Sequence, residues 1–285
     1  PLESAAAPGT SPELREALNS PVPVSSLGLT ASAVPFRGTS NRASILLLLE
    51  IDGSRFRFMD KDGKLTNDIE FVAVPLDSSG KARDGARDQV TITPRPQTRD
   101  LILARGIRIV RRIDLPAGRY SVRVGARESG SGAIGSLVLD VDVPDFGKGP
   151  LVMSGIALTS ATATSTLTAR PDDQLKDVLP APPTVVREFA PEDQLTLFAE
   201  VYDHIRAPHR VEIKTTVTAD DGKVVYAQTD MRGSEELGAR GDGFGHLRTV
   251  PLKNFAAGRY VLRVEARGLV SDGGSVSRDL EFAVR

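Results

Sequence analysis

The sequence predicts an all-β protein made of two tandem β-sandwich domains, immunoglobulin-like or fibronectin type III-like, with a short N-terminal helix. Three observations lead to this prediction: an internal repeat, a period-two alternation of apolar residues in both copies, and a tyrosine that opens the same strand in each copy. The expected boundaries are 1–20 for a linker with the helix, 21–147 for the first sandwich and 148–285 for the second.

The internal repeat is clearest where residues 115–127 (LPAGRYSVRVGAR) recur as residues 255–267 (FAAGRYVLRVEAR). Upstream, 79–81 matches 221–223 and 47–50 matches 197–200. The matches keep their order along the chain, which indicates one fold copied twice with insertions in its loops. A solenoid needs at least three short repeats, so two domains are expected.

Both copies alternate with the period of a half-buried antiparallel strand. Four apolar positions of each repeat face one way, namely Tyr120, Val122, Val124 and Ala126, and Tyr260, Leu262, Val264 and Ala266. The segments 137–143, 211–217 and 280–284 alternate in the same manner. Asp-Gly and Ser-Gly pairs mark the turns between these strands.

Tyr120 and Tyr260 are the expected structural site residues. A Gly-Arg-Tyr sequence that leads into an alternating strand is typical of a tyrosine corner, in which the hydroxyl bonds to backbone a few residues upstream. Val122 and Leu262 stand two residues later, where antibody domains carry a cysteine, so apolar packing replaces the disulfide there. The chain has no tryptophan, and only the generic sandwich is therefore supported.

Helix is scarce in the sequence. Ser11 as cap, Pro12 at the first helical position and early acidic residues predict about two turns over 11–18. Residues 144–194 form the expected connection between domains, stiffened by prolines. Within it, 151–158 is expected to be the first strand of the second domain, and 161–168 a surface loop.

Composition excludes several kinds of chemistry. The chain has no cysteine, so disulfides, thiolate zinc sites and a cysteine nucleophile are impossible, and no cofactor is expected. Lys and Arg total 36 against 37 Asp and Glu, which argues against nucleic acid as a partner. The longest apolar run, 45–49, is far shorter than the roughly 20 residues of a membrane span, so no membrane insertion is expected.

Two short motifs resemble ligand-binding loops. Gly130–Gly135 fits the dinucleotide fingerprint, but a strand follows where a helix is required, which favours a hairpin loop. Asp60 and Asp62 resemble half of a calcium loop, but Lys64 occupies a ligand position and strands flank the segment. A polar turn is the preferred interpretation, with a weak calcium site left open.

Candidate catalytic groups are few. His204 and His209, with Asp203 beside them, lack helical spacing and a third ligand, and His246 stands alone. No Gly-x-Ser-x-Gly elbow occurs, and the Ser78 to Lys81 pair lies in an expected turn. An enzyme is therefore not expected, and a hydrolase would require a pocket that holds His204 or His209 beside a carboxylate.

Two surface patterns are also open to a functional interpretation. Arg240-Gly241-Asp242 is an integrin-type tripeptide, here attributed to chance in a glycine-rich loop. Arginines recur at alternate positions of each repeat and are expected to pair with acids of the following strand instead of binding a polyanion. These are Arg119, Arg123 and Arg127 with Asp140 and Asp142, and Arg259, Arg263 and Arg267 with Asp279 and Glu281.

The chain resembles the carboxy-terminal region of bacterial von Willebrand factor A (VWFA)-related proteins. The resemblance rests on short segments spread from about residue 18 to the end, which are 34–38, 115–120, 143–146, 153–155, 197–203, 208–209, 219–222, 236–238 and 257–267. It implies an exported protein (periplasmic, cell-surface or secreted) with an A domain upstream. That A domain is not in this chain, because Asp77-Ser-Ser-Gly-Lys81 departs from its Asp-x-Ser-x-Ser metal motif.

We therefore expect a non-catalytic accessory region that acts as a spacer, stabiliser or protein-binding (adhesion) module. Its expected partners are the upstream A domain and other surface proteins. The alternative is a carbohydrate-binding module on a sheet face, which would gain support if Tyr202, Tyr226 and Phe244 were exposed together.

Overall fold

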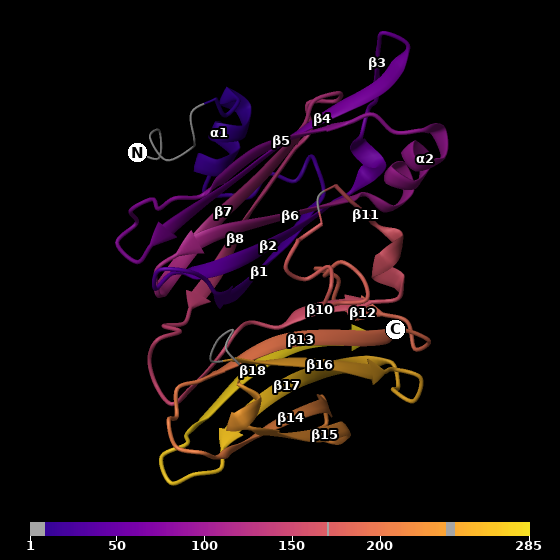
Figure 1. Cartoon of the computed structure of the whole chain (residues 1–285). Helices are drawn as coiled ribbons and strands as arrows, with labels where there is room; N and C mark the ends of the chain where they lie inside the picture. The colour runs from indigo at the N-terminus through magenta and orange to yellow at the C-terminus, as the bar shows by residue number, and fades with distance from the viewer. Residues whose placement is uncertain (1–8, 170, 238–242) are drawn as a thin grey trace. The chain divides into compact units, whose positions relative to one another are not determined.

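A computed structural model describes residues 9–169, 171–237 and 243–285, and Figure 1 shows its strands and helices. The structure is 54% strand and 10% helix, with two α-helices in the described part. The strands assemble into β-sandwiches, which confirms the predicted fold class. Neither α-helix of the described ranges is long and apolar enough to cross a membrane.

The described residues pack into two compact units. The first comprises the residues up to Ala33, then 42–143 and 165–172, and the second comprises 34–41, 144–164 and 173–285. These units differ from the expected linker 1–20 and domains 21–147 and 148–285, because the N-terminal helix belongs to the first unit, the boundary lies after Val143, and two segments are exchanged. Residues 34–41 pack with the second unit and residues 165–172 with the first.

Two sheets belong to the first unit, one ordered β1-β2-β6-β11 and the other β3-β4-β7-β8 with β5 paired to β4. The strands are β1 (Leu29–Arg37), β2 (Ala43–Ile51), β3 (Met59–Lys61), β4 (Lys64–Asp77), β5 (Ala86–Ile92), β6 (Ile107–Leu115), β7 (Gly118–Glu128), β8 (Ile134–Val143) and β11 (Leu167–Thr168). Strand β2 is buried on both faces over Ile45–Leu49, which explains its continuous apolar run.

Helix α1 (Pro12–Asn19) covers the outer face of the β4-β7 sheet. Leu14 and Leu18 pack there against Val72 and Val74. Gly125 makes room for the helix, since a Cβ at this position would lie 2.9 Å from Leu14 Cδ1. The predicted helix is present, but the Ser11 side chain makes no cap hydrogen bond. Its backbone N–H donates to Glu70 Oε1 instead.

Helix α2 (Pro96–Arg105) was not predicted from the sequence. Its apolar residues Leu101, Ile102 and Leu103 are consecutive and form no helical stripe, and only Ile102 is buried. The sequence signal for this helix lies at its two ends, because Pro96 stands at its first position and Gly106 caps its end with a positive φ of 75°. A proline at the first helical position and a glycine after the last one are typical of a helix.

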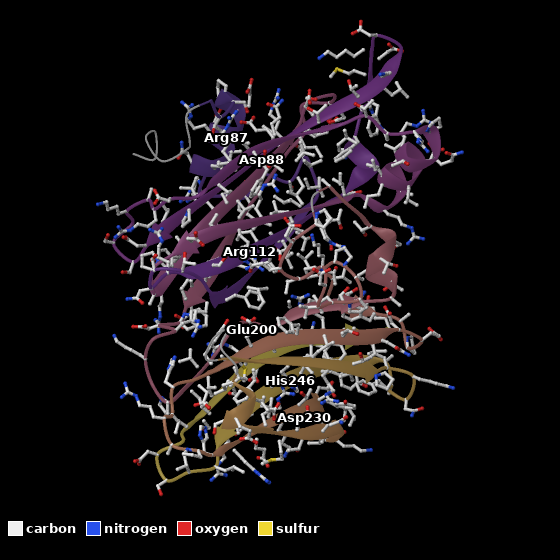
Figure 2. The ribbon with its side chains drawn as sticks, in the orientation of Figure 1. Arg87, Asp88, Arg112, Glu200, Asp230 and His246 are labelled. Carbon is white, nitrogen blue, oxygen red and sulfur yellow. The ribbon has the colours of Figure 1, made fainter. Side chains whose placement is uncertain are left out.

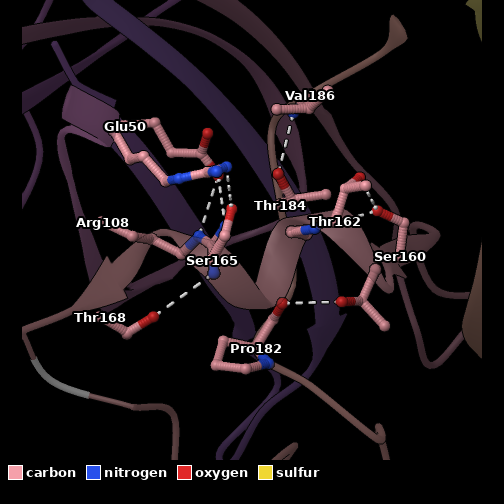
Figure 3. A network of polar contacts seen from close by, with 12 residues as sticks. Glu50, Arg108, Ser160, Thr162, Ser165, Thr168, Pro182, Thr184 and Val186 are labelled. Atoms are coloured by element: carbon pink, nitrogen blue, oxygen red, sulfur yellow. Dashed lines mark hydrogen bonds and ion pairs between the residues drawn. The ribbon is translucent and has the colours of Figure 1, made fainter. Parts of the chain in front are cut away.

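The sequence predicted a surface loop over 161–168, and this prediction is wrong at the end of the range, where the strand β11 forms. A 3₁₀ turn, η3, spans Thr162–Ser165, and β11 then pairs in parallel with β6. The Arg108 guanidinium, fully buried, lies 2.8 Å from Glu50 Oε1 and donates to Thr168 Oγ1 (Figure 3). Arg112 adds a bidentate contact to Asp172. Arginines of β6 therefore fasten this segment to the first unit.

The second unit also has two sheets. One is ordered β10-β13-β16 with β9 paired to β13, and the other is ordered β12-β18-β17-β14-β15. The strands are β9 (Leu151–Met153), β10 (Ala157–Ser160), β12 (Glu188–Phe189), β13 (Gln194–Asp203), β14 (Arg210–Ala219), β15 (Val224–Gly233), β16 (Gly243–Pro251), β17 (Gly258–Gly268) and β18 (Ser275–Val284). The expected single strand over 151–158 is thus divided into β9 and β10. Two further 3₁₀ turns are η2 (Gly53–Arg55) in the first unit and η4 (Ser234–Glu236) in the second.

The core of the second unit comes from both sheets. Leu197 and Val201 of β13 face Ile213 of β14 and Leu262 and Val264 of β17, all at most 1% exposed. Alternate residues of β17 are therefore buried between the sheets, as the period-two pattern predicts. The outward row pairs opposite charges instead, since Lys214 and Glu265 stand opposite each other.

The covered outer face of β7 and the open outer face of β17 can be compared to test the packing of α1. Replacing Gly125→Glu places a carboxylate beneath Leu14 and Leu18, and we expect a loss of about 2 to 4 kcal/mol in the free energy of unfolding. The control is Glu265→Ala at the matching position of the open face, for which a change below about 1 kcal/mol is expected. Urea denaturation measures both, and equal losses would contradict the proposed packing.

Candidate functional site

The two predicted site residues, Tyr120 and Tyr260, occupy the same position in the two sandwiches. The Tyr120 hydroxyl donates to the Pro116 carbonyl at 3.0 Å, and the Tyr260 hydroxyl donates to the Ala256 carbonyl at 2.6 Å. Both rings are buried, and burial raises the pKa of both phenols. Each tyrosine thus ties the start of its strand to the preceding turn, which is the geometry of a tyrosine corner.

The candidate histidines of the β13–β14 loop do not form a metal pair. His204 is half-buried, with Nδ1 2.9 Å from the Gly149 carbonyl oxygen. His209 is buried, with Nε2 2.9 Å from Asp203 Oδ2 and its side chain 1% exposed. The two atoms are close, but their geometry falls short of a linear hydrogen bond. Ser234 Oγ accepts from the His209 backbone N–H at 3.1 Å, and His209 Nδ1 lies 2.8 Å from the Ala207 carbonyl oxygen.

His246, which carried no signal in the sequence, lies in a connected polar cluster of the second unit. Its Nε2 is 2.8 Å from Thr215 Oγ1, and its Nδ1 is 3.5 Å from Asp230 Oδ2. Asp230 also accepts from Arg248. Figure 2 labels His246 and Asp230, which come from β16 and β15. A hydroxyl on Nε2 and a carboxylate near Nδ1 is the connectivity of a catalytic triad.

Accessibility decides what the His246 cluster can do. Thr215 is 0% exposed and His246 is 4% exposed, so no substrate carbonyl reaches the hydroxyl. Thr215 lies on β14 and His246 on β16, in opposite sheets, and their hydrogen bond joins the two layers of the sandwich. Burial lowers the pKa of His246 to about 4, which keeps the imidazole neutral at pH 7. The cluster therefore acts as an inter-sheet clamp.

Tyr202 is the centre of a second cluster in the same unit. Its hydroxyl donates to Glu200 and accepts from the Arg37 backbone N–H at 3.0 Å. The Phe146 ring packs edge-on against it, and the Arg37 guanidinium lies 5.0 Å from the ring centre. Segments 34–38, 143–146, 153–155 and 197–203 meet here, with Pro35 accepting from Gly155. Arg37, Phe146 and Glu200, which come from three separate segments, thus meet at one tyrosine, which the sequence did not reveal.

The two loops that resembled ligand sites are ordinary connections. Asp62 and Gly63 both have positive φ and close the β3–β4 hairpin, while Asp60 Oδ1 accepts from the Gly63 N–H at 2.9 Å. This is a two-residue hairpin turn of the Asp-Gly type, as preferred in the sequence interpretation. No group of three His, Asp or Glu suited to a metal ion occurs in the described part of the chain.

The Gly130–Gly135 loop is held by Glu128, which is 0% exposed. Its carboxylate accepts backbone N–H groups of Arg57, Gly130 and Ser131. Burial alone would raise the pKa of Glu128, but the hydrogen bonds from Ser131 and Arg57 outweigh it and lower the pKa. The loop joins β7 to β8 without a helix, so it lacks the helix N-terminus that a dinucleotide requires.

Surface hollows do not bring catalytic groups together. A hollow of about 650 Å³ in the first unit is lined by Glu50 and Asp52, but Glu50 is paired with Arg108, and Asp52 accepts from Ser54. Two others, of about 640 and 400 Å³, lie beside Tyr120 and Tyr260. None of the three is lined by a histidine.

The aromatic residues proposed for sugar binding are not exposed together. Tyr202 and Phe244 are buried, so the exposed aromatic platform that would favour sugar binding does not form.

The arginines, the Ser78–Lys81 pair and the tripeptide are the remaining candidates from the sequence. Of the expected arginine–acid pairs, Arg263 and Asp279 form a bidentate contact, whereas Arg123 stands opposite Val138 and donates to the Leu18 carbonyl. Ser78 and Lys81 lie in a turn organised by Asp77. The tripeptide 240–242 lies outside the described residues.

Comparisons with known proteins give no family assignment. No family model and no curated protein sequence matches the chain. Among solved structures, the C-terminal domain of Wzt shares 12% identity over 48% of this chain and 75% of that one, with a TM-score of 0.32. A calcium-binding mutant of Bacteroides uniformis β-glucuronidase 2 shares 10% over 92% of this chain and 28% of that one, with a TM-score of 0.31. Red sea bream transglutaminase shares 12% over 92% of this chain and 32% of that one, with a TM-score of 0.27.

Removing one corner hydroxyl tests the role of the tyrosines. Tyr260→Phe removes the hydroxyl that donates to the Ala256 carbonyl, and we expect the free energy of unfolding to fall by about 1 kcal/mol. Tyr226→Phe is the control, because the Tyr226 hydroxyl donates to Gln228 at the exposed edge of the sheet. An unchanged melting temperature for Tyr260→Phe would contradict the assignment.

The His246 clamp predicts a pH dependence of stability. The folded-state pKa lies near 4 and the unfolded value near 6.5, so only the unfolded chain takes up this proton in that window. The contribution of neutral His246 to the free energy of unfolding is fully present above about pH 6.5, and about 3 kcal/mol of it is lost as the pH drops to about 4. Because carboxylates also titrate at the acid end, native protein is compared with His246→Gln by urea denaturation. An identical pH slope in the two proteins would contradict the clamp.

Proposed function

We propose that this chain is a non-catalytic accessory region of an exported protein, in which two β-sandwiches act as a spacer and protein-binding module. The observation that carries the proposal is the sealed His246 cluster. Its triad-like connectivity is the strongest catalytic arrangement in the described residues, and Thr215, which would be the nucleophile, is 0% exposed. The cluster instead stabilises the fold, because its hydrogen bond joins the two sheets of the sandwich.

Other polar groups support the same proposal. His209 and Asp203 are buried against each other, and the Glu128 carboxylate is occupied by backbone N–H groups of its own loops. Burial of such groups is tolerated because the chain supplies their partners. The proposed partner is an upstream A domain, which the sequence resemblance to VWFA-related proteins implies.

The test separates binding from turnover. The purified chain is incubated with glycoside, ester and peptide substrates, and no hydrolysis above that of His246→Gln is expected. The same protein is applied to a glycan array and to surface proteins of the native organism, which are tested before and after they are treated with protease. Binding that the protease removes, with no glycan signal, is the expected result. Turnover that His246→Gln abolishes, or selective glycan binding, would refute the proposal.

A further inference from the structure

Strand β15 is the terminal strand of its sheet and pairs only with β14 among the described strands. Its alternation is inverted, because the side that faces the sandwich is polar and the side that faces solvent is largely apolar. The inward residues are Tyr226, Gln228, Asp230 and Arg232, opposite the buried row of β14. The outward residues of the regular ladder are Ala227, Thr229 and Met231, and Val225 precedes them at the ladder irregularity. Both Val225 and Met231 are substantially exposed, at 36% and 45%.

The free backbone edge of β15 comes from these same outward residues. The Ser234 N–H donates to the His209 carbonyl, one residue beyond the last ladder pair, Arg210 with Gly233. Because bonded and non-bonded pairs alternate in an antiparallel ladder, residues 226, 228, 230 and 232 bond to β14. The peptide groups of Ala227, Thr229 and Met231 therefore point away from β14, toward the open side of the sheet.

Edge strands commonly carry outward charges, especially lysine, that block pairing with another strand. The outward row of β15 carries none. The irregularity in the β14–β15 ladder lies between Val217 and Thr218, so the segment 226–233 is in regular register. A regular edge with an apolar outer row and free peptide groups is suited to strand addition.

We propose that β15 pairs antiparallel with β15 of a second copy of this chain, about a twofold axis at Thr229. This register is self-complementary at each position. Thr229 meets its own copy and Ala227 meets Met231 of the other chain, on the outer face. On the inner face, Gln228 meets Asp230 and Tyr226 meets Arg232. Each pairing is of a favourable cross-strand kind: hydroxyl with hydroxyl, small with large apolar, amide with carboxylate, and aromatic with cation.

Neighbouring registers that keep free peptide groups opposite each other are poorer. An axis at Ala227 places Asp230 opposite Val224 and Met231 opposite Lys223. An axis at Met231 places Ala227 opposite Glu235 and leaves Tyr226 beyond the paired segment. The axis at Thr229 also brings nearly the whole strand, Val224–Gly233, into the pairing.

A single added strand buries little surface, so the association is expected to be weak and reversible. It is measured by sedimentation at high protein concentration with the whole chain. Thr229→Glu places two like charges at the axis, while within one chain it faces Lys214. Dimer formation should weaken by at least about tenfold. Ser275→Glu, exposed on the same sheet and opposite Arg267, is the matched control and should dimerise like the native chain.

The absence of cysteine permits a second, register-specific measurement. Thr229→Cys should form a disulfide-linked dimer under mild oxidation, because a bonded antiparallel pair has Cα atoms about 5.5 Å apart, within disulfide range. Ala227→Cys alone should not, since its copy lies about 14 Å along the strand. Mixing Ala227→Cys with Met231→Cys should restore cross-linking, and Ser277→Cys, on β18, is the control.

These experiments decide the proposal in either direction. A native dimer that Thr229→Glu disrupts and Thr229→Cys traps is the expected result. A chain that stays monomeric at high concentration, or a dimer that Thr229→Glu leaves intact, would overturn it. Equal cross-linking of Ala227→Cys and Thr229→Cys would overturn the register. The cysteine variants also report on pairing if Thr229→Glu fails to fold.

Discussion

Burying a polar side chain costs free energy unless the protein supplies a partner, and this constraint decides where the chemistry-bearing residues of the chain lie. His246 is held between Thr215 and Asp230, and Glu128 is held by backbone N–H groups. These contacts join sheets and loops that apolar packing alone would leave in several registers. His246 and Glu128 are thereby committed to architecture, and the proposal of a spacer and binding module rests on that commitment.

The same constraint accounts for the divergence of the two copies. In the first sandwich the outer face is apolar, with Val72 beside Gly125, and helix α1 covers it. At the matching place in the second sandwich, Lys214 faces Glu265 and the sheet is open. The covered face thus has a glycine, which leaves room for the helix, and the open face has a glutamate at the matching position. The edge strand β15, with its inverted polarity, is a further departure that a duplicated sandwich alone does not require.

The strands could be predicted because their alternation is regular, and Tyr120 and Tyr260 stand in identical local sequences. Helix α2 was missed because Leu101 to Leu103 form no stripe, and β11 was missed because its partner in β6 lies far away in the sequence. The His246 cluster was invisible for the same reason, since Thr215, Asp230 and His246 come from three strands. Pairing across sheets is set by the register of the whole fold, which local spacing does not encode.

The central claim is that the catalytic-looking groups of this chain are sealed clamps, and the ionisation of His246 tests it most directly. The histidine ring signals are followed by two-dimensional NMR across a pH titration of the folded protein. The account predicts that His246 keeps a neutral imidazole down to about pH 4, well below the value of about 6.5 for a solvated histidine. Titration of His246 near that solvated value would contradict it, because the ring would then be open to water and free to act as a base.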